Sequence, residues 1–380
     1  MEQYIENTVQ DIHASDLEMC MVIAGAGNQA VDWLLNVPGA SNTILDVSIP
    51  YSEHAMADLL SYLPESIVST ESACAMAVRS FVSANKYSET SKNIIGVGCT
   101  ATIATNREKR GDHRVVIGVC TPNKLCTFTL VLNKGMRDRI EEDFVVSSLL
   151  LNVVSIYAGI NFSLEKVLLE HEAVDYQEIT LNKCLNMVES GHIPYVILDS
   201  ALSTEYTLPL EDSCAIFPGS FNPLHDGHKE MSSVLEDKFG LDSLYETSIV
   251  NVDKPPLGYD EILERVSQFK NSEKLVITNQ ATFVGKAAKL GGYRFLVGWD
   301  TAKRILDPKY YLDAQDMCKK LAQMLANGNT FYVAGRLNQG KFNGINDLII
   351  PSGLEGLFIG ISENLFRSDI SSTEIRENRQ

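Results

Sequence analysis

From Ser213 onward the chain alternates short apolar runs with longer amphipathic stretches. The apolar runs, which we interpret as strands, are Cys214–Phe217, Thr247–Val252, Lys274–Thr278, Arg294–Val297, Thr330–Ala334 and Leu357–Ile361. The expected helices between them are 228–238, 259–269, 282–290 and 314–326. This alternation predicts an α/β fold with a doubly wound parallel sheet, in which ligands bind at the carboxyl ends of the strands.

A short motif follows the first of these strands. After a turn at Gly219, the residues His225-Asp226-Gly227-His228 open a helix and place two imidazoles one helical turn apart. A helix start carries unpaired N–H groups and partial positive charge, so it favours phosphate oxygens. We therefore expect His225 and His228 to donate hydrogen bonds to phosphates as charge builds in a transition state. Gly219 is expected to allow a positive φ and a close approach of phosphate. Ser220 and Phe221, which follow it, are expected to bind the nucleotide with it.

A second anion site is expected in Ile370–Arg376, where hydroxyl groups precede a predicted helix. Ser371, Ser372 and Thr373 lie at its start and Arg376 one turn inside, a pattern suited to the phosphates that leave as pyrophosphate.

Together these stretches resemble the H-x-G-H nucleotidyltransferase superfamily. The segment Ile370–Arg376 is similar to the I-S-S-T-x-I-R signature of its adenylyltransferase branch, notably the nicotinamide or nicotinate mononucleotide adenylyltransferases. The R-T-x-G-I-S-T-S ending typical of the cytidylyltransferase branch is missing.

The resemblance implies roles at three further strand ends. Lys254 would neutralise the attacking phosphate or the leaving group. Gly298 and Asp300 would contact the sugar region of the nucleotide, and Arg336 would lie near the acceptor. Trp299 either stacks on a flat acceptor ring or packs in the core.

The expected reaction is attack by a phosphate monoester on the α-phosphorus of ATP, with release of pyrophosphate. Positioning and electrostatic stabilisation suffice for this step, and His225, His228, Lys254 and Arg376 would supply the donors. No carboxylate cluster suggests a metal cage, so Mg²⁺ is expected to arrive with ATP. Mononucleotide is the favoured acceptor. The alternatives are phosphopantetheine, another nucleotidyl transfer, and a nucleotide sensor without turnover.

Residues 1–161 form a separate α/β unit, residues 162–212 a connector, and residues 213–380 the transferase domain. In the first unit, adjacent apolar runs at 115–120 and 127–132 read as a hairpin, so an α/β/α layered mixed sheet is expected. No repeat is visible.

Two interpretations of residues 1–161 compete. Gly25–Ala30, with Asp46 downstream, has the outline of a dinucleotide-binding fingerprint. The other interpretation is a resemblance to the C-terminal domain of competence/damage-inducible proteins, the fold of nicotinamide mononucleotide deamidases. It is carried by Tyr51–Ala55, by Ser69–Ser72 and by Gly96–Ala101, which lies where the family has a glycine-containing loop. That family's serine falls at Ala26 and its lysine near Ala55. Because amide hydrolysis needs an activated hydroxyl or its equivalent, we expect no deamidase activity and a domain kept for binding, regulation or assembly into a homo-oligomer.

Composition limits the partners. A net charge of −17 argues against a nucleic-acid surface. No apolar run is long enough to cross a membrane, and the acidic start resembles neither a signal nor a transit peptide. The eight cysteines lack metal-binding spacing, which indicates reduced thiols and a cytoplasmic location.

Overall fold

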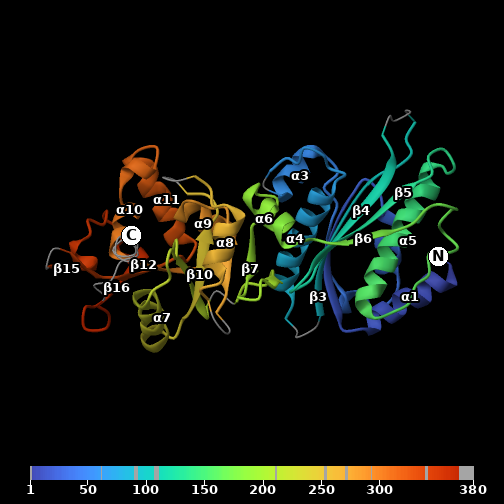
Figure 1. Ribbon diagram of the computed structural model, residues 1–380. Helices are drawn as coiled ribbons and strands as arrows, with labels where there is room; N and C mark the ends of the chain where they lie inside the picture. Colours follow the sequence, from blue (N-terminus) through green and yellow to red (C-terminus); the bar gives the residue numbers. More distant parts are fainter. Residues whose placement is uncertain are drawn as a thin grey trace. The chain divides into compact units, whose positions relative to one another are not determined.

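The chain forms two compact units, residues 1–193 with 205–207 and residues 194–204 with 208–380. The computed structural model (Figure 1) describes residues 2–60, 62–89, 93–106, 111–209, 212–251, 255–269, 273–291, 293–338 and 341–367. None of the helices in these ranges is long and apolar enough to span a bilayer. All eight cysteines are free thiols.

The sheet of the first unit has the strand order β2-β1-β3-β4-β5-β6. Its strands are β1 Leu17–Ala24, β2 Ile44–Ser48, β3 Asn93–Thr102, β4 His113–Cys120, β5 Leu125–Leu132 and β6 Asp175–Glu178. β1 is parallel to both β2 and β3, whereas the pairs from β3 to β6 are antiparallel. The mixed sheet and the β4–β5 hairpin confirm the prediction.

Helices cover both faces of this sheet (Figure 1). They are α1 Gln3–Ala14, α2 Asn28–Asn36, α3 Glu53–Leu60, α4 Thr70–Tyr87, α5 Arg139–Ala158 and α6 Leu181–Glu189. α1, α2 and α5 share one apolar core with the sheet, while α3 and α4 pack against β1 on the other side. The acidic start hid α1, whose residues Ile5, Val9 and Ile12 recur at helical spacing and are buried.

Gly96–Ala101 corresponds to a loop of the family that the sequence resembles, but these residues lie inside β3. The apolar run Ile94–Gly98 favours a strand at this place, and the structure confirms it. The glycines serve packing: a Cβ on Gly96 would lie 2.1 Å from the backbone nitrogen of Phe81, and one on Gly98 would lie 2.5 Å from the carbonyl oxygen of Ala73. Both contacts are with α4, which therefore approaches the sheet more closely than a side chain would allow.

In the second unit the strand order is β16-β13-β12-β9-β10-β11-β7-β8. The parallel strands are β9 Cys214–Pro218, β10 Asp242–Ser248, β11 Leu275–Thr278, β12 Arg294–Gly298, β13 Phe331–Ala334 and β16 Phe358–Ile361. Numbered from β9, their order is 3-2-1-4-5-6, that of a doubly wound sheet, as predicted.

Helices lie on both faces of this sheet as well, and short elements complete the unit. The helices are α7 Asp226–Phe239, α8 Tyr259–Val266, α9 Phe283–Leu290, α10 Trp299–Ile305 and α11 Ala314–Ala326. α9, α10 and α11 bury apolar side chains in one core cluster. The small strands are β14 Arg336–Asn338 and β15 Lys341–Asn343, and the 3-10 turns of the chain are Ala40–Asn42, Pro308–Tyr310, Ile345–Asp347 and Glu355–Leu357.

Residues 162–212 are shared between the two units. β6 pairs with β5 in the first unit, whereas β7 Tyr195–Leu198 runs antiparallel to β11 in the second and is followed by β8 Thr204–Glu205.

The second strand of the parallel sheet lies earlier than predicted, at Asp242–Ser248 instead of Thr247–Val252. Glu246 misled the prediction, since a charged residue argues against a buried strand. Here it is fully buried and paired with Lys286.

Gly96→Ala should destabilise the protein, because its Cβ would meet α4 backbone that cannot move alone. We expect a loss of about 1–3 kcal/mol in unfolding free energy, measured by urea denaturation. Gly111→Ala is the control, since nothing lies within 4 Å of its added Cβ. A wild-type urea midpoint for Gly96→Ala would contradict the packing argument.

Candidate nucleotide site

The two histidines of the H-x-G-H motif lie together where the chain passes from β9 into α7. His225 is the N-cap of α7, and His228 stands in its first turn. The imidazole rings are stacked, with centroids 3.7 Å apart and planes inclined by 24°. Both rings are half-buried.

Burial keeps both imidazoles neutral at physiological pH. It lowers the pKa of His228 to about 3, with a further contribution from the neighbouring His225. Burial also lowers the pKa of His225, an effect partly opposed by Asp226. The backbone N–H of His225 donates to Nδ1 of His228 at 3.3 Å, so the proton of neutral His228 is on Nε2. His228 can therefore donate one hydrogen bond to a phosphate through Nε2.

Hydrogen bonds from neighbouring elements fix the loop between β9 and His225. Thr247 Oγ1 donates to the carbonyl of Gly219 at 2.8 Å, and the buried Arg265 donates from Nε to the carbonyl of Ser220 at 3.2 Å. Gln268 donates to the carbonyl of Phe221 at 2.9 Å and accepts from the Leu224 N–H at 2.8 Å. Sequence reasoning missed Arg265 and Gln268, whose only sequence signal is polarity at the end of a predicted helix.

Gly219 does not have the positive φ that we expected; Phe221 has it instead, at 41°. Glycine is required at 219 because a Cβ there would lie 2.6 Å from the Phe221 ring. That ring is fully buried, 5.2 Å from the ring of His228. The Phe221 ring thus packs edge-to-face against the ring of His228. Ser220 is exposed in the loop.

The predicted residues at the ends of β12 and β13 also come together. Gly298 is the N-cap of α10, and Asp300 forms an ion pair with Arg336. Trp299 is buried, and no hydrogen-bond partner for its indole N–H is found among the described residues. Lys303 Nζ lies 5.4 Å from the centroid of the Trp299 ring, and stacking on an acceptor ring stays a prediction.

β9 and β12 are the neighbours between which the strand order reverses. Their pairing runs through Arg294–Ala215 and Phe295–Ile216, and both strands continue beyond it to Gly298 and Pro218. In doubly wound sheets ligands bind in the crevice at this reversal. The histidines and Gly298–Asp300 follow the two strands that border it. Lys254, Ser371, Ser372, Thr373 and Arg376 lie outside the described residues, as does any convergence of the two motifs.

A pocket with aromatic walls lies at the same edge of the sheet, where the parallel strands have their carboxyl ends. It has a volume of about 180 Å³ and is formed by the segments that follow β10, β11 and β12. Its lining residues are Asn251, Ala281, Thr282, Phe283, Val284, Thr301, Arg304, Ile305, Tyr310 and Tyr311. Whole small-molecule sites measure about 300–1,000 Å³, so this pocket suits one part of a ligand, such as a flat ring.

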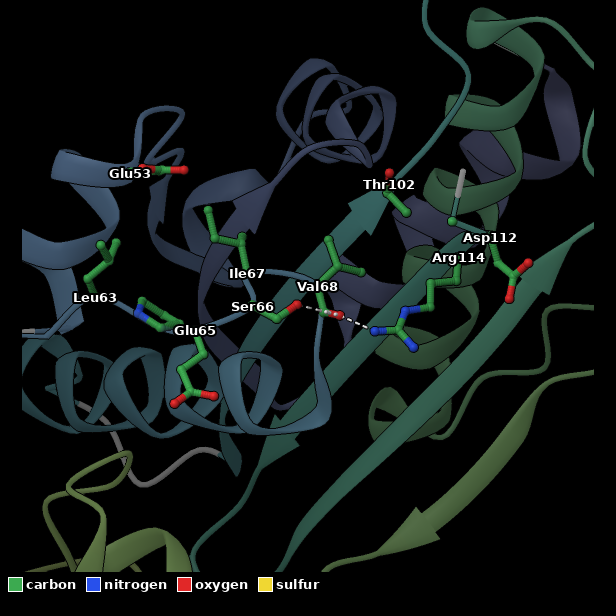
Figure 2. Close-up of a pocket in the computed structure, with 11 residues that line it drawn as sticks. Glu53, Leu63, Glu65, Ser66, Ile67, Val68, Thr102, Asp112 and Arg114 are labelled. Atoms are coloured by element: carbon green, nitrogen blue, oxygen red, sulfur yellow. Dashed lines mark hydrogen bonds between the residues drawn. The ribbon is translucent and has the colours of Figure 1, made fainter. Parts of the chain in front are cut away.

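The first unit has a larger cavity of its own, of about 790 Å³. Figure 2 shows Glu53, Glu65 and Asp112 around it, and Arg114 directed at the carbonyl of Val68. Among the described lining residues three carboxylates face one guanidinium, a charge balance that opposes binding of a phosphate monoester.

Two residues singled out in the first unit have structural roles. The N–H of Gly27 at the start of α2 donates to Asp143 Oδ1 at 2.7 Å, so the protein's own carboxylate occupies the place of a dinucleotide phosphate. Ala26 is fully buried. No group of three or more potential metal ligands is found in the described part of the chain.

Residues 216–378 match the model of the cytidylyltransferase-like family. The second unit is therefore a nucleotidyltransferase domain, and the protein is an enzyme of the nucleotidyltransferase class. No curated protein gives a significant match.

Several solved structures are similar to the chain. Competence/damage inducible protein CihA from Agrobacterium tumefaciens is 16% identical, with 41% of this chain and 97% of that one covered and a TM-score of 0.32. A competence or damage-inducible protein from Enterobacter asburiae is 13% identical, with 40% of this chain and 98% of that one covered and a TM-score of 0.32. A competence-damaged protein (CinA) superfamily protein from Enterobacter cloacae is 13% identical, with 40% of this chain and 92% of that one covered and a TM-score of 0.31.

Because folded His228 resists protonation, stability should fall as pH falls. The unfolded chain binds protons at histidine below an ordinary pKa of about 6.5, whereas folded His228 binds one only near a pKa of about 3. Between pH 7 and 5 the wild type should lose about 1–2 kcal/mol more unfolding free energy than His228→Asn, as measured by urea denaturation. Equal losses would show that His228 is not held neutral.

Proposed function

We propose that the protein transfers AMP from ATP to nicotinamide or nicotinate mononucleotide and releases pyrophosphate. The observation that carries this proposal is the stacked, neutral histidine pair beside the strand-order reversal of a nucleotidyltransferase domain. In this position His228 Nε2–H would donate to ATP where negative charge develops, and the partial positive charge at the start of α7 would add to its effect.

The attacking group is the phosphate of the mononucleotide, which displaces pyrophosphate in line from the α-phosphorus. No residue of the protein needs to form a covalent intermediate. His225 would donate a second hydrogen bond, and Lys254, Arg376 and the hydroxyls of Ser371, Ser372 and Thr373 would neutralise the leaving phosphates. Mg²⁺ would enter bound to ATP and would neutralise part of the negative charge of its phosphates.

The aromatic pocket favours an acceptor with a flat ring. Phe283, Tyr310 and Tyr311 provide ring faces, and Thr282 and Asn251 lie beside them. The pyridine ring of a mononucleotide has the shape for such a pocket, whereas phosphopantetheine has no ring. The ion pair of Asp300 and Arg336 lies at the ends of β12 and β13, where Asp300 would meet a ribose and Arg336 the phosphate of the acceptor.

For the first unit we propose ligand binding or self-association without amide hydrolysis. Ala26 provides no hydroxyl. Glu142 stands near where the family that the first unit resembles would have basic residues; it is fully buried, with Oε1 2.8 Å from His113 Nδ1. A nucleotide sensor is the alternative for the whole chain. Release of pyrophosphate from ATP, Mg²⁺ and mononucleotide distinguishes the two, because a sensor would bind ATP without releasing pyrophosphate.

His228→Ala should lower turnover by about a hundredfold or more, the scale for loss of a transition-state donor. Pyrophosphate release measures it, with His54→Ala as a control because His54 is an exposed histidine of α3. Unchanged turnover in His228→Ala would remove this residue from the mechanism.

Tyr310→Ala should raise the KM for the mononucleotide by about tenfold while leaving the KM for ATP unchanged, because it removes one aromatic wall of the pocket. The control is Leu312→Ala, whose side chain is 89% exposed and lies outside the lining. An equal rise in both KM values would place the acceptor ring elsewhere.

A further inference from the structure

Glu246 of β10 and Lys286 of α9 form an ion pair inside the second unit. Their relative exposures are 0% and 5%. Lys286 Nζ lies 2.5 Å from each carboxylate oxygen, and Thr278 Oγ1 donates to the same carboxylate at 2.6 Å. Both charges give up hydration on burial, and apolar side chains of similar size often produce an equally stable or more stable fold. Stability alone therefore does not explain the pair.

On one side the pair is attached to the loop between β9 and His225, which we call the phosphate-binding loop after its proposed role. The backbone carbonyl of Glu246 accepts the N–H of Gly219 at 2.9 Å. The next residue, Thr247, donates from Oγ1 to the carbonyl of Gly219 at 2.8 Å. Both backbone groups of Gly219 are thus held by β10, and a shift of this strand would move the turn that leads to His225.

On the other side the pair is attached to the aromatic pocket. Lys286 lies in the first turn of α9, where its N–H donates to the carbonyl of Thr282 at 2.9 Å. Thr282 caps the helix by accepting the N–H of Gly285 at 3.1 Å. Thr282, Phe283 and Val284 all line the pocket. A shift of Lys286 would therefore displace one wall of the pocket.

We infer that Glu246 and Lys286 are positioning residues that set the spacing between the acceptor pocket and the phosphate-binding loop. This inference rests on the proposed function. In-line transfer requires the phosphate of the acceptor close to the α-phosphorus of ATP, and a misplacement of about 1 Å can cost about a hundredfold in rate. A hydrogen-bonded ion pair specifies one geometry, whereas apolar side chains in its place would allow β10 and α9 to shift.

The test replaces both partners, because removal of one would leave a buried charge uncompensated. Glu246→Leu/Lys286→Met should melt at the wild-type temperature or higher, yet its kcat/KM for the mononucleotide should fall about a hundredfold. ATP affinity, measured by calorimetry without acceptor, should change by less than about threefold, because Arg265 and Gln268 still hold the loop. The control is Arg137→Met/Glu172→Leu, which removes an ion pair of 2.7 Å between half-buried Arg137 and buried Glu172 in the first unit and should keep wild-type kcat/KM.

Wild-type kcat/KM in the folded double variant would overturn the inference, and so would an equal fall in the control. If the wild type itself turns over no mononucleotide, the proposed function fails and hydrogen exchange decides the role of the pair. The amides of Gly285 and Lys286 should then exchange faster in the double variant than in the wild type without any ligand. Equal exchange rates would overturn the positioning role.

Discussion

The reversal of strand order between β9 and β12 determines where the residues of the candidate site lie. After β9 the chain enters α7, whereas after β12 it enters α10, which packs in the core with α9 and α11. In a doubly wound sheet the connections leave toward opposite faces at such a point and open a crevice. The histidine pair and the Asp300–Arg336 ion pair follow from this topology, because each lies at the end of a strand in or beside the reversal.

Buried polar groups hold the crevice in shape. Thr247, Arg265 and Gln268 donate hydrogen bonds to the carbonyls of Gly219, Ser220 and Phe221, so the backbone of this loop is satisfied by the protein itself. The buried ring of Phe221 packs edge-to-face against the ring of His228. His228 is thereby neutral and held in place before a ligand arrives, an arrangement that can stabilise a transition state with little reorganisation.

Periodicity and local chemistry allowed the strands, most helices and the histidine motif to be predicted. The errors arose where tertiary contacts reverse a local preference. Glu246 hid β10 because its partner Lys286 is distant in sequence. Gly219 suggested a positive φ, yet the neighbouring Phe221 ring is what requires a glycine there, just as the backbone of α4 requires Gly96 inside β3. Arg265 and Gln268 carried no motif, since their function is to bind backbone.

A crystal structure with a non-hydrolysable ATP analogue and Mg²⁺ would show whether the H-x-G-H histidines bind the triphosphate. We expect the triphosphate at the carboxyl ends of β9 and β12, with His228 Nε2 within about 2.7–3.2 Å of a phosphate oxygen. A triphosphate bound away from the H-x-G-H loop, or one that His228 does not contact, would contradict it.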